Sequence, residues 1–120
     1  MDERGWEADV IFDQKDFLER VESDKELARQ VGEMFLADAR EKISVIRDLI
    51  DKSHAGELVN AAHSLKGASA NMSALRLRRI ASDLENAAKN ADIAGARGMI
   101  GLLENAVAEF ESELKRHDLL

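Results

Sequence analysis

The chain has 120 residues, of which 45% are apolar and 34% are charged, and its formal net charge is -7. A chain of this length favours a single domain that buries roughly two-thirds of its unfolded surface, which excludes a two-domain enzyme with a deep interdomain cleft. The acidic balance argues against nucleic acid as a partner, and the lack of Cys excludes disulfides, thiolate metal sites and cysteine nucleophiles.

The chain start and its hydropathy indicate a cytoplasmic domain without membrane contact. No apolar run approaches the roughly 18 residues that a membrane span needs. The charged residues 1–4 lack the apolar stretch of a secretion signal. Residues 1–9 are mostly charged, with only Trp6 breaking the polarity. We therefore expect a flexible segment over 1–9 and one helical domain over 10–120.

The amino-acid composition predicts an all-α fold, because Pro, Thr and Tyr are absent while the helix-forming residues Ala, Leu, Glu, Lys and Arg dominate. The first predicted helix is short, follows Asp13 as its cap and ends near Val21. Phe12 and Phe17 are spaced to pack across its start as a hydrophobic staple.

A long second helix follows, and Ser23 with Glu26 forms a capping box at its start. Its apolar stripe comprises Leu27, Val31, Phe35, Ala39, Ile43, Ile46 and Ile50. Residues 51–54 break this helix. The third helix carries a stripe made of Leu58, Ala62, Leu65, Ser69 and Met72.

Ser73 is expected to cap a fourth helix whose inward-facing residues end at Ala88. Residues 90–92 are expected to turn the chain into a fifth helix, whose apolar stripe runs from Ala96 to Leu114. Four long amphipathic helices joined by short turns must bury their apolar stripes against one another. The sequence therefore predicts an antiparallel four-helix bundle with a short additional N-terminal helix over one end.

His63 stands out on the third helix because it lies about 140° from Leu58, on the face turned toward solvent. Lys66 and Gly67 follow it at the third and fourth positions, where side chains are neighbours on a helix. A Gly inside a helix costs about 1 kcal/mol relative to Ala, so Gly67 calls for a reason such as close approach by a partner.

These residues suit a phosphoryl acceptor. A neutral imidazole, with a reference pKa of about 6.5, is a good nucleophile near neutral pH, and Lys66 would offer charge-assisted hydrogen bonds to phosphoryl oxygens. The chain has no Gly-rich phosphate-binding loop. The remaining parts of the chemistry must therefore come from another protein or domain.

The segment 62–72, with the sequence AHSLKGASANM, resembles the signature of histidine-containing phosphotransfer (HPt) domains. The similarity extends to an Ile-Phe-Asp start at 11–13, a Phe-Leu pair at 35–36 and Leu84-Glu85 on the fourth helix. It covers nearly the whole domain. The resemblance implies a phosphorelay intermediate of two-component signalling, with His63 accepting phosphoryl groups at Nε2 from receiver-domain aspartates and passing them on.

The resemblance also implies roles for neighbouring residues. Lys66 would assist the charge and Gly67 would keep the site open. Glu85 takes the place of a Gln or Glu that is common on the neighbouring helix, where it could orient the ring or repel the phosphoryl group. The expected partner-binding residues are Val59, Ala70, Arg76, Arg79 and Glu85.

The implied partners are response-regulator receiver domains, with a hybrid histidine kinase in the same chain as an alternative arrangement. We expect a monomer with no cofactor or metal of its own and no independent enzymatic activity, while Mg²⁺ belongs to the receiver. His54 and His117 lack a Lys and Gly at these offsets and are expected to be ordinary surface residues. A helical adaptor that binds receivers or kinases without being phosphorylated remains the alternative function.

Overall fold

Four long helices form an antiparallel bundle, preceded by a short helix. The computed structural model describes residues 10–120, and within that range it contains no strand. The elements are α2 (Gln14–Arg20), α3 (Lys25–Asp51), α4 (Ala55–Asn71), α5 (Leu75–Lys89), α6 (Ile93–Gly98) and α7 (Ile100–Arg116). The predicted flexible segment 1–9, with Trp6, lies outside the described residues.

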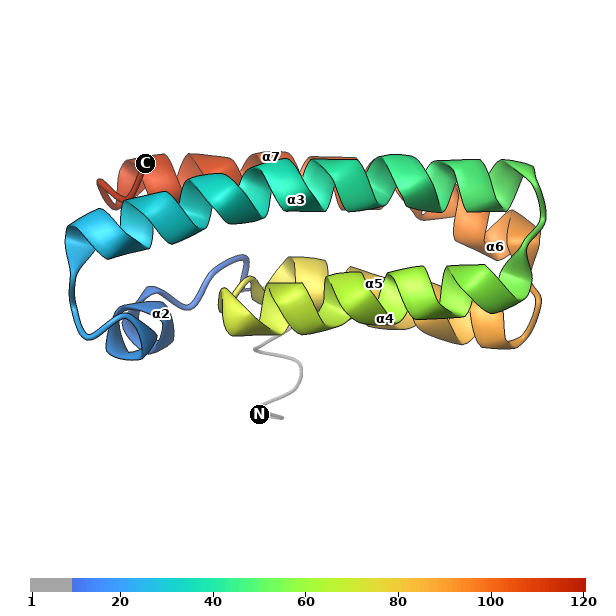
Figure 1. The fold of residues 1–120 in the computed structure, drawn as a ribbon, viewed down its shortest axis with the longest axis horizontal. Coiled ribbons are helices and arrows are strands. Elements are labelled where there is room, and N and C mark those ends of the chain that lie inside the picture. The colour runs from blue at the N-terminus through green and yellow to red at the C-terminus, as the bar shows by residue number, and fades with distance from the viewer. Residues whose placement is uncertain (1–9) are drawn as a thin grey trace.

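Each long helix packs against two others. α3 contacts α4 and α7, and α5 contacts the same two helices. Figure 1 shows α3 beside α7 in one layer and α4 beside α5 in the other. The contact between α4 and α5 is the most extensive in the molecule. The predictions of an all-α fold and of a four-helix bundle are therefore confirmed.

α2 completes one end of the bundle, where the long helices differ in length. α3 has 27 residues and α4 has 17, which corresponds to about 40 Å and about 25 Å. α2 occupies the space beyond the ends of α4 and α5, under the first turns of α3 (Figure 1). The ring of Phe12 lies 5.6 Å from that of Phe17 and 5.2 Å from that of Phe110, centroid to centroid. The predicted staple is thus part of an aromatic cluster in the core.

The start of α2 is held by hydrogen bonds to its own cap and to the turn between α4 and α5. The carboxylate of Asp13 accepts from the backbone N–H of Asp16 at 3.0 Å, which confirms Asp13 as the cap. The backbone N–H of Asp13 donates to the carbonyl of Ser73 at 3.0 Å. The Ser73 hydroxyl donates to the carboxylate of Asp16 at 2.6 Å.

The predicted core stripe of α3 is correct from Phe35 onward and wrong at its start. Leu27 is 42% exposed, whereas Ala28 is fully buried. Steps of four residues turn a helix by about 40° each, so Leu27 lies about 80° from Phe35 and leaves the core face. Ala28 and Gly32 take its place. A Cβ on Gly32 would lie 3.3 Å from a methyl group of Leu114, so small residues let α3 and α7 approach closely here.

The two predicted serine caps are wrong, because both serines belong to the preceding turns. Ser23 and Ser73 have φ values of 60° and 56°. The cap of α3 is Asp24, which accepts from the backbone N–H of Leu27 at 3.0 Å. Ala74 is the cap residue of α5 and makes no side-chain hydrogen bond. A residue with a left-handed backbone conformation typically follows the end of a helix, so Ser23 and Ser73 close the preceding helices and do not cap the next ones.

The predicted fifth helix is two helices. Asp92 accepts from the backbone N–H of Gly95 at 2.9 Å and caps α6, which begins directly after the turn expected at 90–92. The backbone N–H of Met99 then bonds to the carbonyl of Ala96, three residues back, and this tighter turn separates α6 from α7. Gly98 and Gly101 flank the break, and Gly has a low helix propensity.

The end of α5 gives a test of this turn chemistry. Ala91 is exposed and has φ 53°, and the backbone N–H of Asp92 closes the turn on the carbonyl of Ala87 at 2.8 Å. Because the Cβ of an L-residue is strained in this region, we expect Ala91→Gly to raise the free energy of unfolding by about 1 kcal/mol. Urea denaturation followed by circular dichroism measures this change.

The matched control is Ala37→Gly, at an exposed position inside α3. It should lower the free energy of unfolding by about 0.5–1 kcal/mol, because Gly is a poor residue in a helix interior. A loss of stability in both variants would contradict the strain assigned to Ala91.

Candidate functional site

His63 projects from the solvent-facing side of α4. The opposite side of this helix buries Leu58, Ala62, Leu65 and Ser69 in the bundle core. The side chain of His63 is 66% exposed. The prediction that the imidazole lies on the solvent face is confirmed, and the bundle serves as a rigid support for it.

A buried carboxylate on α5 holds the imidazole from behind. Glu85 follows the core residue Leu84, and its side chain is only 6% exposed. Its Oε2 atom lies 3.0 Å from Nδ1 of His63, and its Oε1 atom accepts a hydrogen bond from Nζ of Lys66 at 2.6 Å. The close packing of α4 against α5 brings these three side chains together.

The charge state of Glu85 decides which ring nitrogen carries the proton. The hydrogen bond from Lys66 lowers the pKa of Glu85 to about 2, helped by the hydrogen bond to His63 and by the charges of Lys66 and Lys89, while burial acts in the opposite direction. An ionised carboxylate only accepts hydrogen bonds, so Nδ1 must be the protonated nitrogen. Nε2 then holds the free lone pair on the exposed side of the ring.

Two lysines, Lys66 and Lys89, form ion pairs with Glu85. The side chain of Lys66 is 32% exposed, and its ammonium group is directed to Glu85. Lys89, one turn after Glu85 on α5, lies 3.7 Å from Oε2 of Glu85 and is 57% exposed. The carboxylate is therefore surrounded by three nitrogen atoms, which explains how it tolerates burial.

Gly67 leaves the surface beside His63 bare. A Cβ built on Gly67 would have no other atom within 4 Å. No packing within residues 10–120 therefore requires glycine at this position. The predicted open space next to the imidazole is present.

The residues expected to bind partners have different surroundings. Val59 and Ala70 are half-buried on α4, and Arg79 is exposed on α5. Arg76 forms an ion pair with Glu109 of α7. Glu85 turns inward, so it has little surface to offer a partner and contacts His63 instead.

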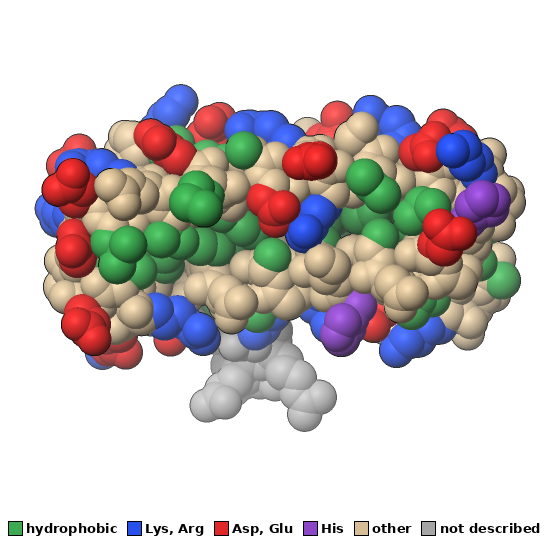
Figure 2. Space-filling view, viewed as in Figure 1, with side chains coloured by type: hydrophobic (Ala, Val, Ile, Leu, Met, Phe, Trp, Pro, Cys, Tyr) green, Lys and Arg blue, Asp and Glu red, His purple; other side chains and the backbone are tan. Residues whose placement is uncertain are grey.

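An apolar groove between α3 and α4 was not among the predicted site residues. It is lined by Val31, Met34, Phe35, Asp38, Ala68, Asn71 and Met72. Met34 is 72% exposed. Figure 2 shows hydrophobic side chains gathered along the boundary between these two helices. The signal in the sequence is a second apolar line on α3 through Leu27, Val31 and Met34, of which Leu27 and Val31 belong to the predicted core stripe.

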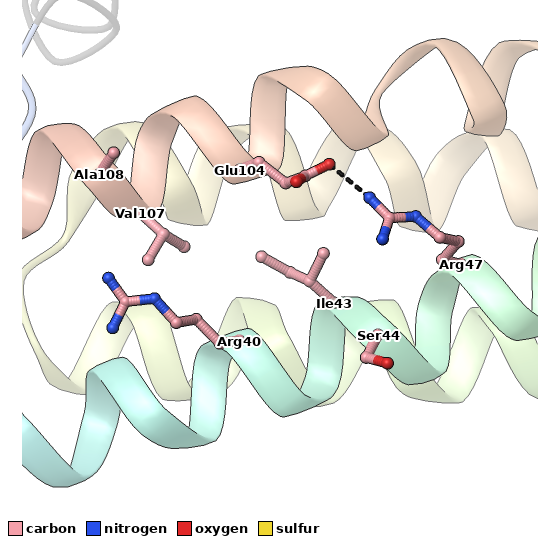
Figure 3. A pocket seen from close by; sticks show the side chains of 7 residues that line it. All are labelled: Arg40, Ile43, Ser44, Arg47, Glu104, Val107 and Ala108. Carbon is pink, nitrogen blue, oxygen red and sulfur yellow. Dashed lines mark hydrogen bonds and ion pairs between the residues drawn. The ribbon is translucent and has the colours of Figure 1, made fainter.

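A second groove lies between α3 and α7, the two long helices that carry neither His63 nor Glu85 (Figure 3). Ile43 and Val107 form its floor. Arg40 and Arg47 border it from α3, and each forms an ion pair with a glutamate of α7, Glu111 and Glu104 respectively. Its charges are therefore balanced within the bundle.

Neither a metal site nor a membrane span is seen in the described part of the chain. Residues 10–120 hold no group of three His, Asp or Glu side chains that could bind a metal ion. None of the helices over the same residues has both the length and the apolar character of a membrane-spanning segment.

An exposed imidazole on a four-helix bundle suits a protein that transfers phosphoryl groups through a histidine. The chain belongs to the Hpt domain family, whose model matches residues 30–113. Its fold is similar to the crystal structure of histidine-containing phosphotransfer protein B (HptB) from Pseudomonas aeruginosa PAO1. That match has a TM-score of 0.83 and 23% sequence identity, and it covers 91% of this chain and 95% of the other. A search of curated proteins finds no match.

Membership of this family gives the chain a phosphorelay role in two-component signalling. Hpt domains pass phosphoryl groups to receiver domains, so receiver domains are the class of partner. The similarity stated from the residues of segment 62–72 is thereby confirmed at the level of the family.

The lowered pKa of Glu85 predicts an acid-sensitive contribution to stability. Because its folded pKa of about 2 lies below the ordinary 4.5, ionised Glu85 stabilises the folded state above pH 4.5, and this contribution disappears as the pH falls from 4.5 toward 2. We expect the difference in unfolding free energy between the wild type and Glu85→Gln to shrink over that pH range, as measured by urea denaturation.

Asp16 and Glu113 also have lowered pKa values, but they are the same in both proteins and cancel in the comparison. A difference that stays constant from pH 6 to pH 3 would show that the ion pairs of Glu85 do not stabilise the fold.

Proposed function

We propose that His63 is the phosphoacceptor and that Nε2 is the reacting atom. The observation that carries this proposal is the hydrogen bond between Nδ1 and buried Glu85, on a ring that is otherwise 66% exposed. It leaves one nucleophilic nitrogen and points that nitrogen outward. His54 and His117 have no comparable buried partner, since each lies 3.6 Å from a glutamate of its own helix segment.

The transfer step follows from this geometry. The lone pair of Nε2 attacks the phosphorus of a phosphorylated aspartate in a receiver domain. The Nε2–P bond forms, the P–O bond to the aspartate breaks, and the aspartate leaves as a carboxylate. Nδ1 keeps its proton, so the phosphorylated ring carries a positive charge. The reverse sequence passes the phosphoryl group to a second receiver, with Mg²⁺ supplied by the receiver.

Glu85 supports this step through the charge of the ring. The positive charge that develops on the imidazole lies next to a carboxylate 3.0 Å from Nδ1. A preorganised charge at the place where the opposite charge develops lowers the barrier. Repulsion of the phosphoryl group is limited, because Nδ1 and Nε2 lie on different sides of the ring. Glu85 is therefore a positioning residue for His63.

The receiver would approach over Gly67, where the surface is open. On α4, Gly67 lies between His63 and the apolar groove toward α3, so a partner that covers the imidazole can also contact Ala68 and Asn71. Val59 and Ala70 flank His63 at the fourth position before it and the seventh after it. Arg79, which is exposed on α5, would extend the contact with positive charge, which suits an acidic receiver surface. The charge of Arg76 is already balanced by Glu109 of α7.

A helical adaptor that binds receivers without phosphorylation is the second candidate, favoured by the exposed groove between α3 and α4. The cytoplasmic location and the monomeric state remain predictions. So does the choice between a free-standing relay protein and a domain of a hybrid sensor kinase.

Replacement of the imidazole tests the proposed acceptor. We expect His63→Gln to take up no acid-labile phosphate from a phosphorylated receiver domain in the presence of Mg²⁺, because no other described imidazole has its Nδ1 held by a buried carboxylate. The measurement is transfer of radiolabelled phosphate, followed by gel electrophoresis before and after mild acid.

His54→Gln is the matched control, because His54 is exposed and starts the same helix. It should be labelled like the wild type. Label that persists on His63→Gln would reject His63 as the acceptor. Receiver binding with unchanged signalling in this variant would instead support the adaptor.

A larger side chain at Gly67 tests the approach of the partner. Gly67→Gln should keep or raise the stability of α4, because Gln is the better helix residue by up to about 1 kcal/mol. Transfer should nevertheless fall by about tenfold or more, since a clash of only about 1.4 kcal/mol with the receiver has that effect. Stopped-flow or quench-flow transfer and thermal unfolding are measured on the same samples.

Gly101→Gln is the control, because a Cβ on Gly101 of α7 likewise meets nothing within 4 Å. It should leave transfer unchanged. If Gly67→Gln transfers phosphate at the wild-type rate, Gly67 has no part in partner access.

A further inference from the structure

The lysine expected to serve the phosphoryl group is already engaged. Nζ of Lys66 donates to Oε1 of Glu85 at 2.6 Å, a short charge-assisted hydrogen bond. Glu85 is only 6% exposed, so a carboxylate there needs a cation beside it. A phosphoryl group on Nε2 would bring up to two negative charges to the same face of α4 and would compete with Glu85 for Lys66.

A second cation stands next to the same carboxylate. Nζ of Lys89 lies 3.7 Å from Oε2 of Glu85, and its side chain is 57% exposed. The distance is longer than a hydrogen bond, so this ammonium group is near the carboxylate without being committed to it. Its four-carbon stem gives it the freedom to close the remaining distance.

We propose that Lys89 is a positioning residue that takes over the charge of Glu85 when Lys66 turns to the phosphoryl group on His63. The proposal rests on His63 as the acceptor. In the unphosphorylated protein Lys66 donates a hydrogen bond to Glu85, and Lys89 lies nearby without a hydrogen bond to it. In the phosphorylated protein Lys89 holds Glu85, which keeps its hydrogen bond to Nδ1, and Lys66 is free to donate to phosphoryl oxygens.

Lys89 differs from other lysines that follow an acid by four residues. Lys52 also pairs with a carboxylate one turn earlier, Asp48, at 2.9 Å, but both of these side chains are more than half exposed. Such a pair in solvent contributes little. Lys89 lies near a carboxylate that is buried and hydrogen-bonded to the ring of His63, so the charge of Lys89 can affect phosphoryl transfer at that ring.

The proposed exchange is tested at the equilibrium between a phosphorylated receiver and the wild type, Lys66→Gln, Lys89→Gln and the double variant. We expect Lys89→Gln to lower the equilibrium constant for transfer of phosphate to His63 about two- to fivefold, the effect of losing a partly exposed ion pair. Lys66→Gln should lower it more. The double variant should resemble Lys66→Gln alone, because Lys89 acts through Lys66.

Two further variants separate this role from a structural one. Lys89→Arg keeps the cation and should restore the equilibrium to within about twofold of the wild type. Lys52→Gln removes a lysine from a pair of the same spacing and should change nothing. Circular dichroism on every variant checks that the bundle is folded.

The proposal is overturned if Lys89→Gln behaves like the wild type, if Lys89→Arg fails to rescue, or if the two single losses multiply in the double variant. Multiplied losses would mean that Lys89 contacts the phosphoryl group independently of Lys66. Failure of the underlying function looks different, because the wild type itself would then carry no phosphate on His63.

Discussion

The contact between Glu85 and His63 is the interaction on which the rest of the site depends. A carboxylate that is 6% exposed accepts from Nδ1 at 3.0 Å, so the ring has one orientation and one tautomer. Every other feature supports this contact. The bundle buries the carboxylate of Glu85. The charges of Lys66 and Lys89 keep this carboxylate ionised. Gly67 leaves the outer face of the ring open.

Placing the buried carboxylate on a separate helix makes the site rigid. His63 belongs to α4 and Glu85 to α5, so their distance is set by the packing of two helices that form the most extensive contact of the bundle. A phosphoryl relay needs a ring that does not reorient between its donor and its acceptor. The same packing keeps the imidazole of His63 exposed, because Glu85 contacts the ring from the side of the bundle core.

The proposed exchange of partners would let one cluster of charges serve two states of the imidazole. The unphosphorylated ring needs only a hydrogen-bond acceptor at Nδ1, which leaves the lone pair of Nε2 free. The phosphorylated ring needs a carboxylate at Nδ1 and cations near the phosphoryl group on Nε2. Glu85 and the two lysines, whose Nζ atoms lie within 3.7 Å of its carboxylate oxygens, provide the groups required for both states. Side chains that exchange partners can meet both needs without movement of the helices.

Local patterns in the sequence were enough for the all-α bundle, the cap at Asp13, the exposed face of His63 and the bare surface at Gly67, because helical periodicity places neighbours that are three or four residues apart. The serine caps were predicted wrongly, because the left-handed φ values of Ser23 and Ser73 depend on how the turns close. The start of the α3 stripe was predicted wrongly although the spacing itself contained the signal, since two steps of four residues carry Leu27 about 80° away from Phe35. The role of Glu85 could be decided only by tertiary structure. Its 22-residue separation from His63 contains no periodic signal, and only the packing of α4 against α5 sets the carboxylate against Nδ1.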